Sequence, residues 1–184
     1  MAIKFGELKK YLSRVTRLSI CFTRGHYDDY LLVSDIPEGK YDDMYVYGVG
    51  MTDVEFPLDE YSTPKEFPQP LLFKDGLFLG AAIEIVMQDE PRDIERINDN
   101  ELTFGDLRDY LQLGRNFTIA RKEDWTEEHY EWRRDIPEEY DSMYVYGIGM
   151  EDDTEGLLKI IHSGFTDSHL AKNMKIVLSE CPRE

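Results

Sequence analysis

The sequence predicts an α+β fold made by tandem duplication of a small α-β-β-β-(variable)-β module, with a helix packed on a mainly antiparallel sheet. The first observation is that the stretch YDDMYVYGVGM at residues 41–51 returns as YDSMYVYGIGM at 140–150, with nine of eleven positions identical. The second is that the segments around this stretch recur in the same order. We therefore predict one module at residues 1–93, a linker at 94–100 and a second module at 101–184.

Each module is expected to open with a helix, at residues 5–12 and 104–111. Apolar residues at the first, fourth, seventh and eighth positions of each segment would form one face of a helix. Thr103 is a favourable N-cap, and Asp106 in the first turn suits the helix dipole. The first module has Lys4 at the cap position, so its helix is expected to begin less firmly.

Two strands are predicted to follow in each copy. The first lies at residues 17–22 and 116–121, where apolar and small polar residues alternate. The second lies at residues 27–33 and 129–134. We expect it to end at the proline that follows, Pro37 in the first copy, because proline cannot donate a ladder hydrogen bond.

The repeated stretch itself is predicted to be the third strand. One face would carry Tyr45, Tyr47 and Val49, and the other Met44, Val46 and Gly48. A strand that is apolar on both faces belongs in the middle of a sheet or at a module interface. The two glycines predict a bulge, or the close approach of another backbone.

The copies diverge after the repeated stretch. Residues 52–70 contain four prolines and predict an irregular loop, whereas the second copy continues with the acidic segment 151–156. Residues 74–76 predict a hairpin turn. The copies converge again at a last strand, predicted at 83–87 and 174–178. A proline followed by a basic and an acidic residue closes both copies.

Acidic side chains outnumber basic ones by 38 to 21, so the net charge is −17. Residues 1–93 contribute 17 acidic and 10 basic side chains, and the remainder contributes 21 and 11, so both halves are acidic. Direct binding of nucleic acid is not expected, because it needs a basic surface. A basic protein partner would be attracted instead.

The two cysteines, Cys21 and Cys181, lie at non-equivalent places in the copies, so we expect reduced thiols rather than a disulfide framework. No apolar run approaches the roughly 18 residues that a membrane span needs. The N-terminus lacks the long apolar region of a signal peptide. These observations predict a cytoplasmic protein with no membrane segment.

The sequence predicts no catalytic, cofactor-binding or metal-binding residues, and we expect the protein not to be an enzyme. The Gly-x-Gly pairs at residues 48–50 and 147–149 lack the third glycine and the following helix of a nucleotide-binding fingerprint. The histidines are not equivalent between the copies and form no metal-binding pattern. These are His26, His129, His162 and His169.

Tyrosines and carboxylates around the repeated stretch are candidates for a partner-binding surface. Tyrosine is enriched at protein–protein hot spots, and neighbouring carboxylates suit a partner rich in arginine and lysine. The candidate residues are Asp42, Asp43, Tyr45, Tyr47, Glu138, Glu139, Asp141, Tyr144, Tyr146, Asp152 and Asp153.

In size, acidity and lack of a catalytic motif, the whole chain resembles the small inhibitors carried by phages and mobile elements, in particular type II anti-CRISPR proteins. The resemblance implies inhibition of Cas9 with its guide RNA, by occupying a positively charged nucleic-acid channel as a DNA mimic would. It includes no residue-level motif, so no functional residues are taken from it.

Two other hypotheses remain open at the level of sequence. The chain could be a small enzyme or ligand-binding protein with a site between its two pseudo-symmetric modules. It could also be an oligomerisation module that uses the Tyr/Val strand as its contact. The sequence leaves the oligomeric state undetermined. The position of the carboxylates would separate these hypotheses: one exposed face favours mimicry, and a cluster with a histidine in a pocket favours an enzyme.

Overall fold

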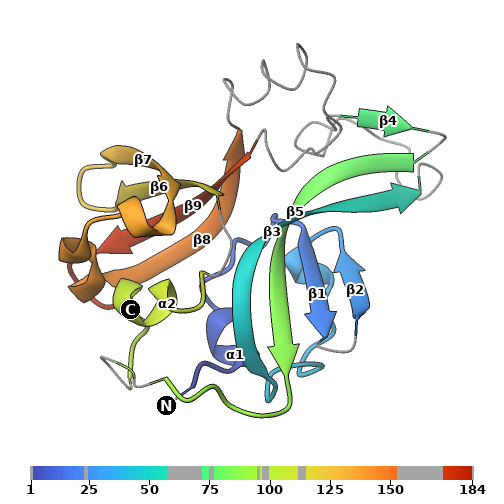
Figure 1. Cartoon of the computed structure of the whole chain (residues 1–184), viewed down its shortest axis with the longest axis horizontal. Coiled ribbons are helices and arrows are strands. Elements are labelled where there is room, and N and C mark those ends of the chain that lie inside the picture. Colours follow the sequence, from blue (N-terminus) through green and yellow to red (C-terminus); the bar gives the residue numbers. More distant parts are fainter. Residues whose placement is uncertain are drawn as a thin grey trace.

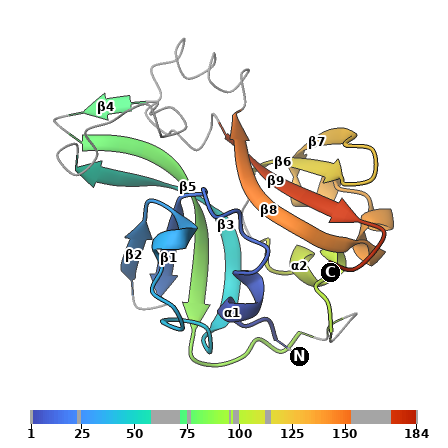
Figure 2. The ribbon, with the colours of Figure 1, turned by 180° about the vertical axis from the view of Figure 1, so that it is seen from behind.

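The computed structural model describes residues 2–22, 25–57, 72–74, 77–94, 96, 100–111, 115–152 and 172–183. Within these residues, the protein is α+β and consists mostly of strands, which form two mixed sheets. One sheet comes from each half of the chain, and the two sheets lie side by side (Figures 1 and 2).

The first sheet has the strand order β2-β1-β5-β3, with β4 paired to β5. Its strands are β1 (Leu18–Phe22), β2 (His26–Tyr30), β3 (Tyr45–Pro57), β4 (Leu72–Lys74) and β5 (Leu77–Gln88). Strand β1 runs parallel to β5, and the other pairs are antiparallel. The pairing of β4 with β5 confirms the predicted hairpin, although residues 75–76 of its turn lie outside the described residues.

The second sheet has the order β7-β6-β9-β8 and the same strand directions. Its strands are β6 (Arg115–Arg121), β7 (Glu127–Trp132), β8 (Tyr144–Asp152) and β9 (Lys172–Ser179). In both sheets the last strand lies between the first and the third and runs parallel to the first. Each sheet is therefore mixed, and the prediction of a mainly antiparallel sheet missed this central parallel pair.

The two helices are shorter than predicted. Helix α1 spans only Phe5–Leu8, and α2 spans Phe104–Arg108. The chain leaves the helical path because the next residues pair with the opposite half. The carbonyl of Tyr11 accepts a hydrogen bond from the Ile148 amide, at 2.7 Å. Residues 5–12 are thus one helical turn followed by an interface segment.

The predicted difference between the helix N-termini is confirmed. The Thr103 hydroxyl accepts a hydrogen bond from the Asp106 amide at 3.2 Å, and the Asp106 carboxylate accepts one from the Thr103 amide, also at 3.2 Å. Lys4 makes no such side-chain cap for α1. The second helix therefore has a capping box, and the first begins without one.

The second strand of each copy ends earlier than predicted. Strand β2 ends at Tyr30 and β7 at Trp132, and short 3-10 helices follow, η1 (Val33–Asp35) and η3 (Arg133–Asp135). The Val33 amide donates to the Thr16 carbonyl at 2.9 Å, which draws the chain away from the sheet. The prolines therefore follow 3-10 turns and do not end the strands.

The predicted bulge in the repeated stretch is confirmed. The pairing register shifts between Val46 and Gly48 in β3, and between Val145 and Gly147 in β8. The extra residue breaks the alternation of faces, so Val46 and Val49 are both buried, and the predicted separation of these two faces is wrong. Strands β3 and β8 each end the strand order of their sheet and contact the opposite half.

The variable region is only partly described. Residues 52–57, predicted to be irregular, belong to β3, which continues along β5. The rest of the predicted loop, 58–70, lies outside the described residues. So does most of the acidic segment of the second copy, because the structure describes Glu151 and Asp152 and resumes at Lys172.

The two halves share one hydrophobic core and make equivalent contacts across their junction. Phe5 and Phe104 are both fully buried in the same cluster of apolar side chains. The Val49 amide donates to the Tyr110 carbonyl at 2.6 Å, which matches the bond from Ile148 to Tyr11. The expected interface between the halves is therefore present.

Two arginines close the junction in matching positions. Arg92 donates to the Tyr47 carbonyl at 2.8 Å in its own half and to the Asp109 carbonyl at 3.0 Å in the other. Arg183 donates to the carbonyls of Tyr146 and Lys10 in the same way, at 3.4 and 2.6 Å. Each arginine thus joins the bulge of its own half to the segment after the opposite helix.

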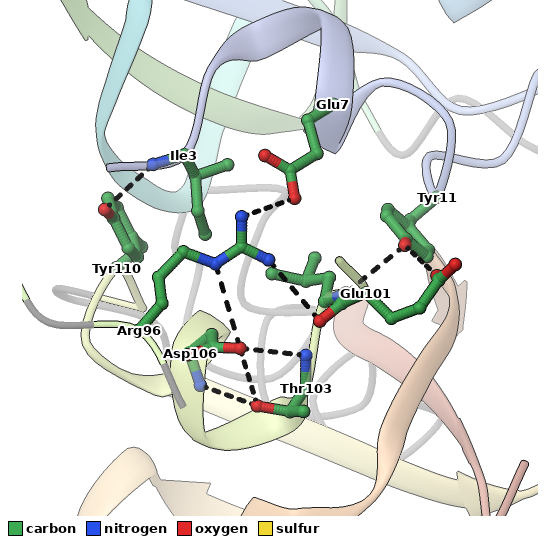
Figure 3. Close-up of polar contacts among 9 residues, drawn as sticks. Ile3, Glu7, Tyr11, Arg96, Glu101, Thr103, Asp106 and Tyr110 are labelled. Carbon is green, nitrogen blue, oxygen red and sulfur yellow. Dashed lines mark hydrogen bonds and ion pairs between the residues drawn. The ribbon is translucent and has the colours of Figure 1, made fainter. Parts of the chain in front are cut away.

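A third arginine, Arg96, lies in the predicted linker and has no counterpart in the repeat. Figure 3 shows its guanidinium between Glu7 of α1 and Asp106 of α2, which occupy equivalent positions in the two copies. The arginine lies 2.8 Å from the Glu7 carboxylate and 4.0 Å from that of Asp106, and it donates to the Glu101 carbonyl at 3.4 Å. Its side chain is only 3% exposed.

Candidate partner-binding surfaces

The predicted site residues of the first copy lie beside α1. Asp43 is 98% exposed and pairs with Lys4 at 3.0 Å. Asp42 is half-buried, and it lies so close to Gly6 that a Cβ added to Gly6 would come within 2.8 Å of the Asp42 Cβ. Tyr45 is half-buried and Tyr47 is exposed. Asp43 is therefore the most open of the four, and Tyr47 is 40% exposed with the Arg92 guanidinium 5.1 Å from its ring centre.

The acidic residues predicted in the second copy serve different purposes. Glu138 and Glu139 are exposed at the start of the 3-10 helix η4 (Glu138–Ser142). Asp141 is structural, because it accepts a hydrogen bond from Arg108 at 2.6 Å. The same guanidinium donates to the Ile136 carbonyl at 2.8 Å, which fixes the loop. The Asp141 carboxylate is therefore held by Arg108, and its side chain is 29% exposed.

Three of the four remaining predicted residues, Tyr144, Tyr146 and Asp152, lie on β8. Tyr144 and Tyr146 are half-buried, and the ammonium group of Lys122 lies 4.0 Å from the centre of the Tyr146 ring. Asp152 is the last residue of β8, and Asp153 lies outside the described residues. The structure thus divides the predicted set between two separate halves instead of gathering it on one face.

The structure brings other carboxylates together along one edge of the second sheet. All eight are exposed, and they lie on the β6–β7 turn, on β7 and on the two 3-10 turns after it. This acidic edge comprises Glu123, Asp124, Glu127, Glu128, Glu131, Asp135, Glu138 and Glu139. Strand β7 pairs only with β6 among the described strands, so it forms the margin of its sheet.

Only Glu138 and Glu139 of the acidic edge were predicted. A signal for the others is present in the sequence: residues 123–139 contain eight acidic residues, whereas the corresponding segment of the first copy, 23–39, contains four. The predicted site residues were instead chosen around the most strongly repeated stretch. That stretch is similar in both copies because it builds the bulge and the junction.

A groove of about 1130 Å³ lies between the first half and the outer face of the second sheet. Its walls are the segment after α1, the strands β8 and β9, and the β6–β7 turn that carries Trp125. Among the described residues that line it, seven are basic, and Asp42 is the only acidic one. The basic residues are Lys9, Lys10, Arg14, Arg17, Lys172, Lys175 and Arg183.

A partly buried polar cluster on the second sheet adjoins this groove through Lys175. The Thr118 hydroxyl lies 2.9 Å from Nδ1 of His129 and donates to Glu151, which also accepts from Lys175 at 2.8 Å. Burial acts to raise the pKa of Glu151, but the bonds from Lys175 and Thr118 outweigh it and lower that pKa. Each charge is matched, as a structural cluster requires.

Other kinds of site find no support in the described part of the chain. No group of three or more His, Cys, Asp or Glu side chains there is placed to hold a metal ion. Cys21 and Cys181 are both free thiols. No helix among the described residues is long and apolar enough to cross a membrane.

Comparisons with known proteins add no assignment. No protein-family model, no curated protein and no solved structure matches this chain.

Proposed function

We propose that this chain is an acidic interaction protein that binds a basic, nucleic-acid-binding protein through the acidic edge and thereby inhibits it. The observation that carries the proposal is the concentration of eight exposed carboxylates along one sheet margin, with Arg134 as the only exposed basic residue in the same stretch. Such a surface would steer a basic cleft toward it at long range, and salt would weaken the complex.

Exposed side chains around the carboxylates support a contact surface. Trp125 is 62% exposed at the turn that begins the acidic edge. Aromatic residues of this kind supply contact area, while the carboxylates supply charge complementarity. The proposal assigns no reaction to the chain, and we place its action in the cytoplasm. We also propose that the two halves arose by duplication, as their common strand order supports.

Cas9 with its guide RNA is the partner to test first, because its nucleic-acid channel is positively charged. Purified protein is added to the Cas9–guide RNA complex at low and at high salt, and both binding and DNA cleavage are measured. We expect binding at low salt, loss of cleavage, and a weaker complex at high salt. Absence of binding at low salt would exclude Cas9. A panel of other basic nucleases would then test the wider class.

A pair of charge-matched variants tests the surface. The first replaces Glu131, Glu138 and Glu139 by glutamine, and the second replaces three exposed acids elsewhere, Glu38→Gln, Asp89→Asn and Glu90→Gln. Both change the net charge by the same amount, so only the position differs. We expect the first variant to weaken inhibition about tenfold more than the second. Equal losses would mean that overall charge, and not the acidic edge, determines binding.

A further inference from the structure

The groove between the halves is lined mainly by basic side chains, although the chain as a whole is acidic. In a chain with a net charge of −17, seven basic side chains and a single acidic one, Asp42, belong to the described residues that line the groove. Lys175 is matched by Glu127 and Glu151. Within the described part of the chain, Lys9, Lys10 and Arg14 have no carboxylate partner, and Lys10 and Arg14 are exposed. These three cations are available to an anion.

The basic lining is particular to this side of the pseudo-symmetric molecule. The positions of the other copy that correspond to five of the seven basic residues carry neutral or acidic residues. The counterparts of Lys10, Arg14, Arg17, Lys172 and Lys175 are Asp109, Leu113, Asn116, Ala81 and Glu84. Only Lys9 and Arg183 have basic counterparts, Arg108 and Arg92. Lys10 and Arg14 are exposed, and the other copy packs at the junction without a cation at either position, so the fold does not require them. Arg17 has a structural role, because it is buried and donates to the Ala81 carbonyl at 2.7 Å.

An aromatic side chain lies at the same groove. Trp125 contributes to its lining and exposes its indole, although its backbone has a φ of 56°, which is unusual for a non-glycine residue. Val15, also exposed, belongs to the same wall as Arg14. A groove with unpaired cations and an open indole suits a ligand that has both a phosphate group and a flat ring.

We propose that this groove binds a small phosphate-bearing ligand with an aromatic ring, of the mononucleotide class. Lys9, Lys10 and Arg14 would hold the phosphate, and Trp125 would stack on the ring. The volume of about 1130 Å³ accommodates a ligand of this size. The net charge limits the ligand to a few negative charges, because the acidic surface beyond the groove would repel a long polyanion.

Tryptophan fluorescence tests the proposal directly. The variant Trp132→Phe leaves Trp125 as the only tryptophan of the chain. It is titrated at low salt with AMP, ATP, adenosine and inorganic phosphate, and calorimetry follows the same additions. We expect saturable quenching by the nucleotides, with adenosine and phosphate each binding at least about tenfold more weakly. Absence of heat and quenching with every nucleotide would overturn the proposal.

Matched arginine variants locate the binding. Arg14→Gln removes one groove cation, and Arg134→Gln removes one cation whose side chain is 81% exposed outside the groove. We expect Arg14→Gln to weaken nucleotide binding about tenfold and Arg134→Gln to leave it within about twofold. Equal effects would overturn the site. Tighter binding of a DNA oligonucleotide or an acidic peptide than of ATP would overturn the ligand class.

Discussion

The junction between the halves is built by residues that are equivalent in the two copies, whereas the groove beside it is lined by residues that differ between them. At the junction, Tyr11 and Tyr110 accept the same backbone hydrogen bond from the opposite strand, and Arg92 and Arg183 close it in the same way. In the groove, equivalent positions carry opposite or no charge, as with Lys175 and Glu84.

This difference separates residues that build the fold from residues that are free to serve a function. A contact that is made twice, by equivalent residues, is what the packing of the two similar halves needs. A charged residue that occurs in one copy only, on an exposed surface, is not required by that packing. This difference supports the two proposed surfaces, the acidic edge and the groove, which both lie where the copies differ.

Removing Arg96 should break the junction most severely, because it is the single arginine that bridges the two equivalent carboxylates. Arg96→Met would leave Glu7 and Asp106 without their shared, nearly buried partner. We expect a loss of about 3 kcal/mol in the free energy of unfolding, measured by urea denaturation. Arg134→Met, at an exposed position, is the control and should change stability by less than about 0.5 kcal/mol. A similar, small change in both variants would contradict the bridging role.

The two junction tyrosines allow the equivalent contacts to be compared. The Tyr110 hydroxyl accepts a hydrogen bond from the buried Ile3 amide at 3.2 Å, and the Tyr11 hydroxyl accepts one from the Leu102 amide at 3.4 Å. Tyr110→Phe leaves the Ile3 amide without an acceptor, so we expect a loss of about 1–2 kcal/mol. Tyr11→Phe should cost less, because Tyr11 is 7% exposed against 0% for Tyr110, and its bond from the Leu102 amide is the longer of the two. Denaturation in parallel checks the order, and the reverse order would refute it.

Much of the secondary structure could be predicted because it depends on local patterns. Alternation of apolar residues located the strands, Thr103 located the second helix, and the paired glycines indicated the bulge. The helix lengths could not be predicted, because residues 11–13 make backbone hydrogen bonds to a strand in the opposite half. The central parallel pair of each sheet also depends on contacts between distant segments, which a repeat pattern does not encode.

The site was less accessible to sequence reasoning than the fold. The partner-binding site was predicted at the repeated tyrosines and carboxylates. In the structure, however, Asp141 is held by Arg108 and Asp42 packs against Gly6. The cations of the groove come from the segment after α1, from β9 and from the C-terminal end of the chain, so no window of sequence contains them together. The positions at which the two copies differ in charge were the sequence signal that could have identified these cations.

The N-termini of the two helices also differ between the copies, and the expected effect on stability is smaller. Thr103 caps α2 by accepting a hydrogen bond from Asp106, whereas Lys4 makes no cap for α1. Thr103→Ala should therefore cost about 1 kcal/mol of stability. Lys4→Ala should have a smaller effect in the same urea titration. If Lys4→Ala were the more damaging change, the two helices would not differ as the capping contacts indicate.

The smallest expected effect concerns Glu84, which takes the place of Lys175 in the first sheet. Burial raises the pKa of Glu84, so its ionised form is disfavoured in the folded state. The stability that it contributes is present below its ordinary pKa and is lost as pH rises through the raised value. Glu84→Gln should therefore raise Tm by about 2 °C at pH 8 and leave it unchanged at pH 4.

Glu151, the partner of Lys175, should respond in the opposite way. Its pKa is lowered, because hydrogen bonds from Lys175 and Thr118 outweigh the effect of burial. Its contribution is present above its ordinary pKa and is lost as pH falls through the lowered value. Glu151→Gln should therefore lower Tm at pH 8, and the difference should shrink in acid. If both variants shifted Tm in the same direction at pH 8, the electrostatic contrast between the two sheets would be wrong, since one carboxylate is disfavoured by burial and the other is stabilised by its neighbours.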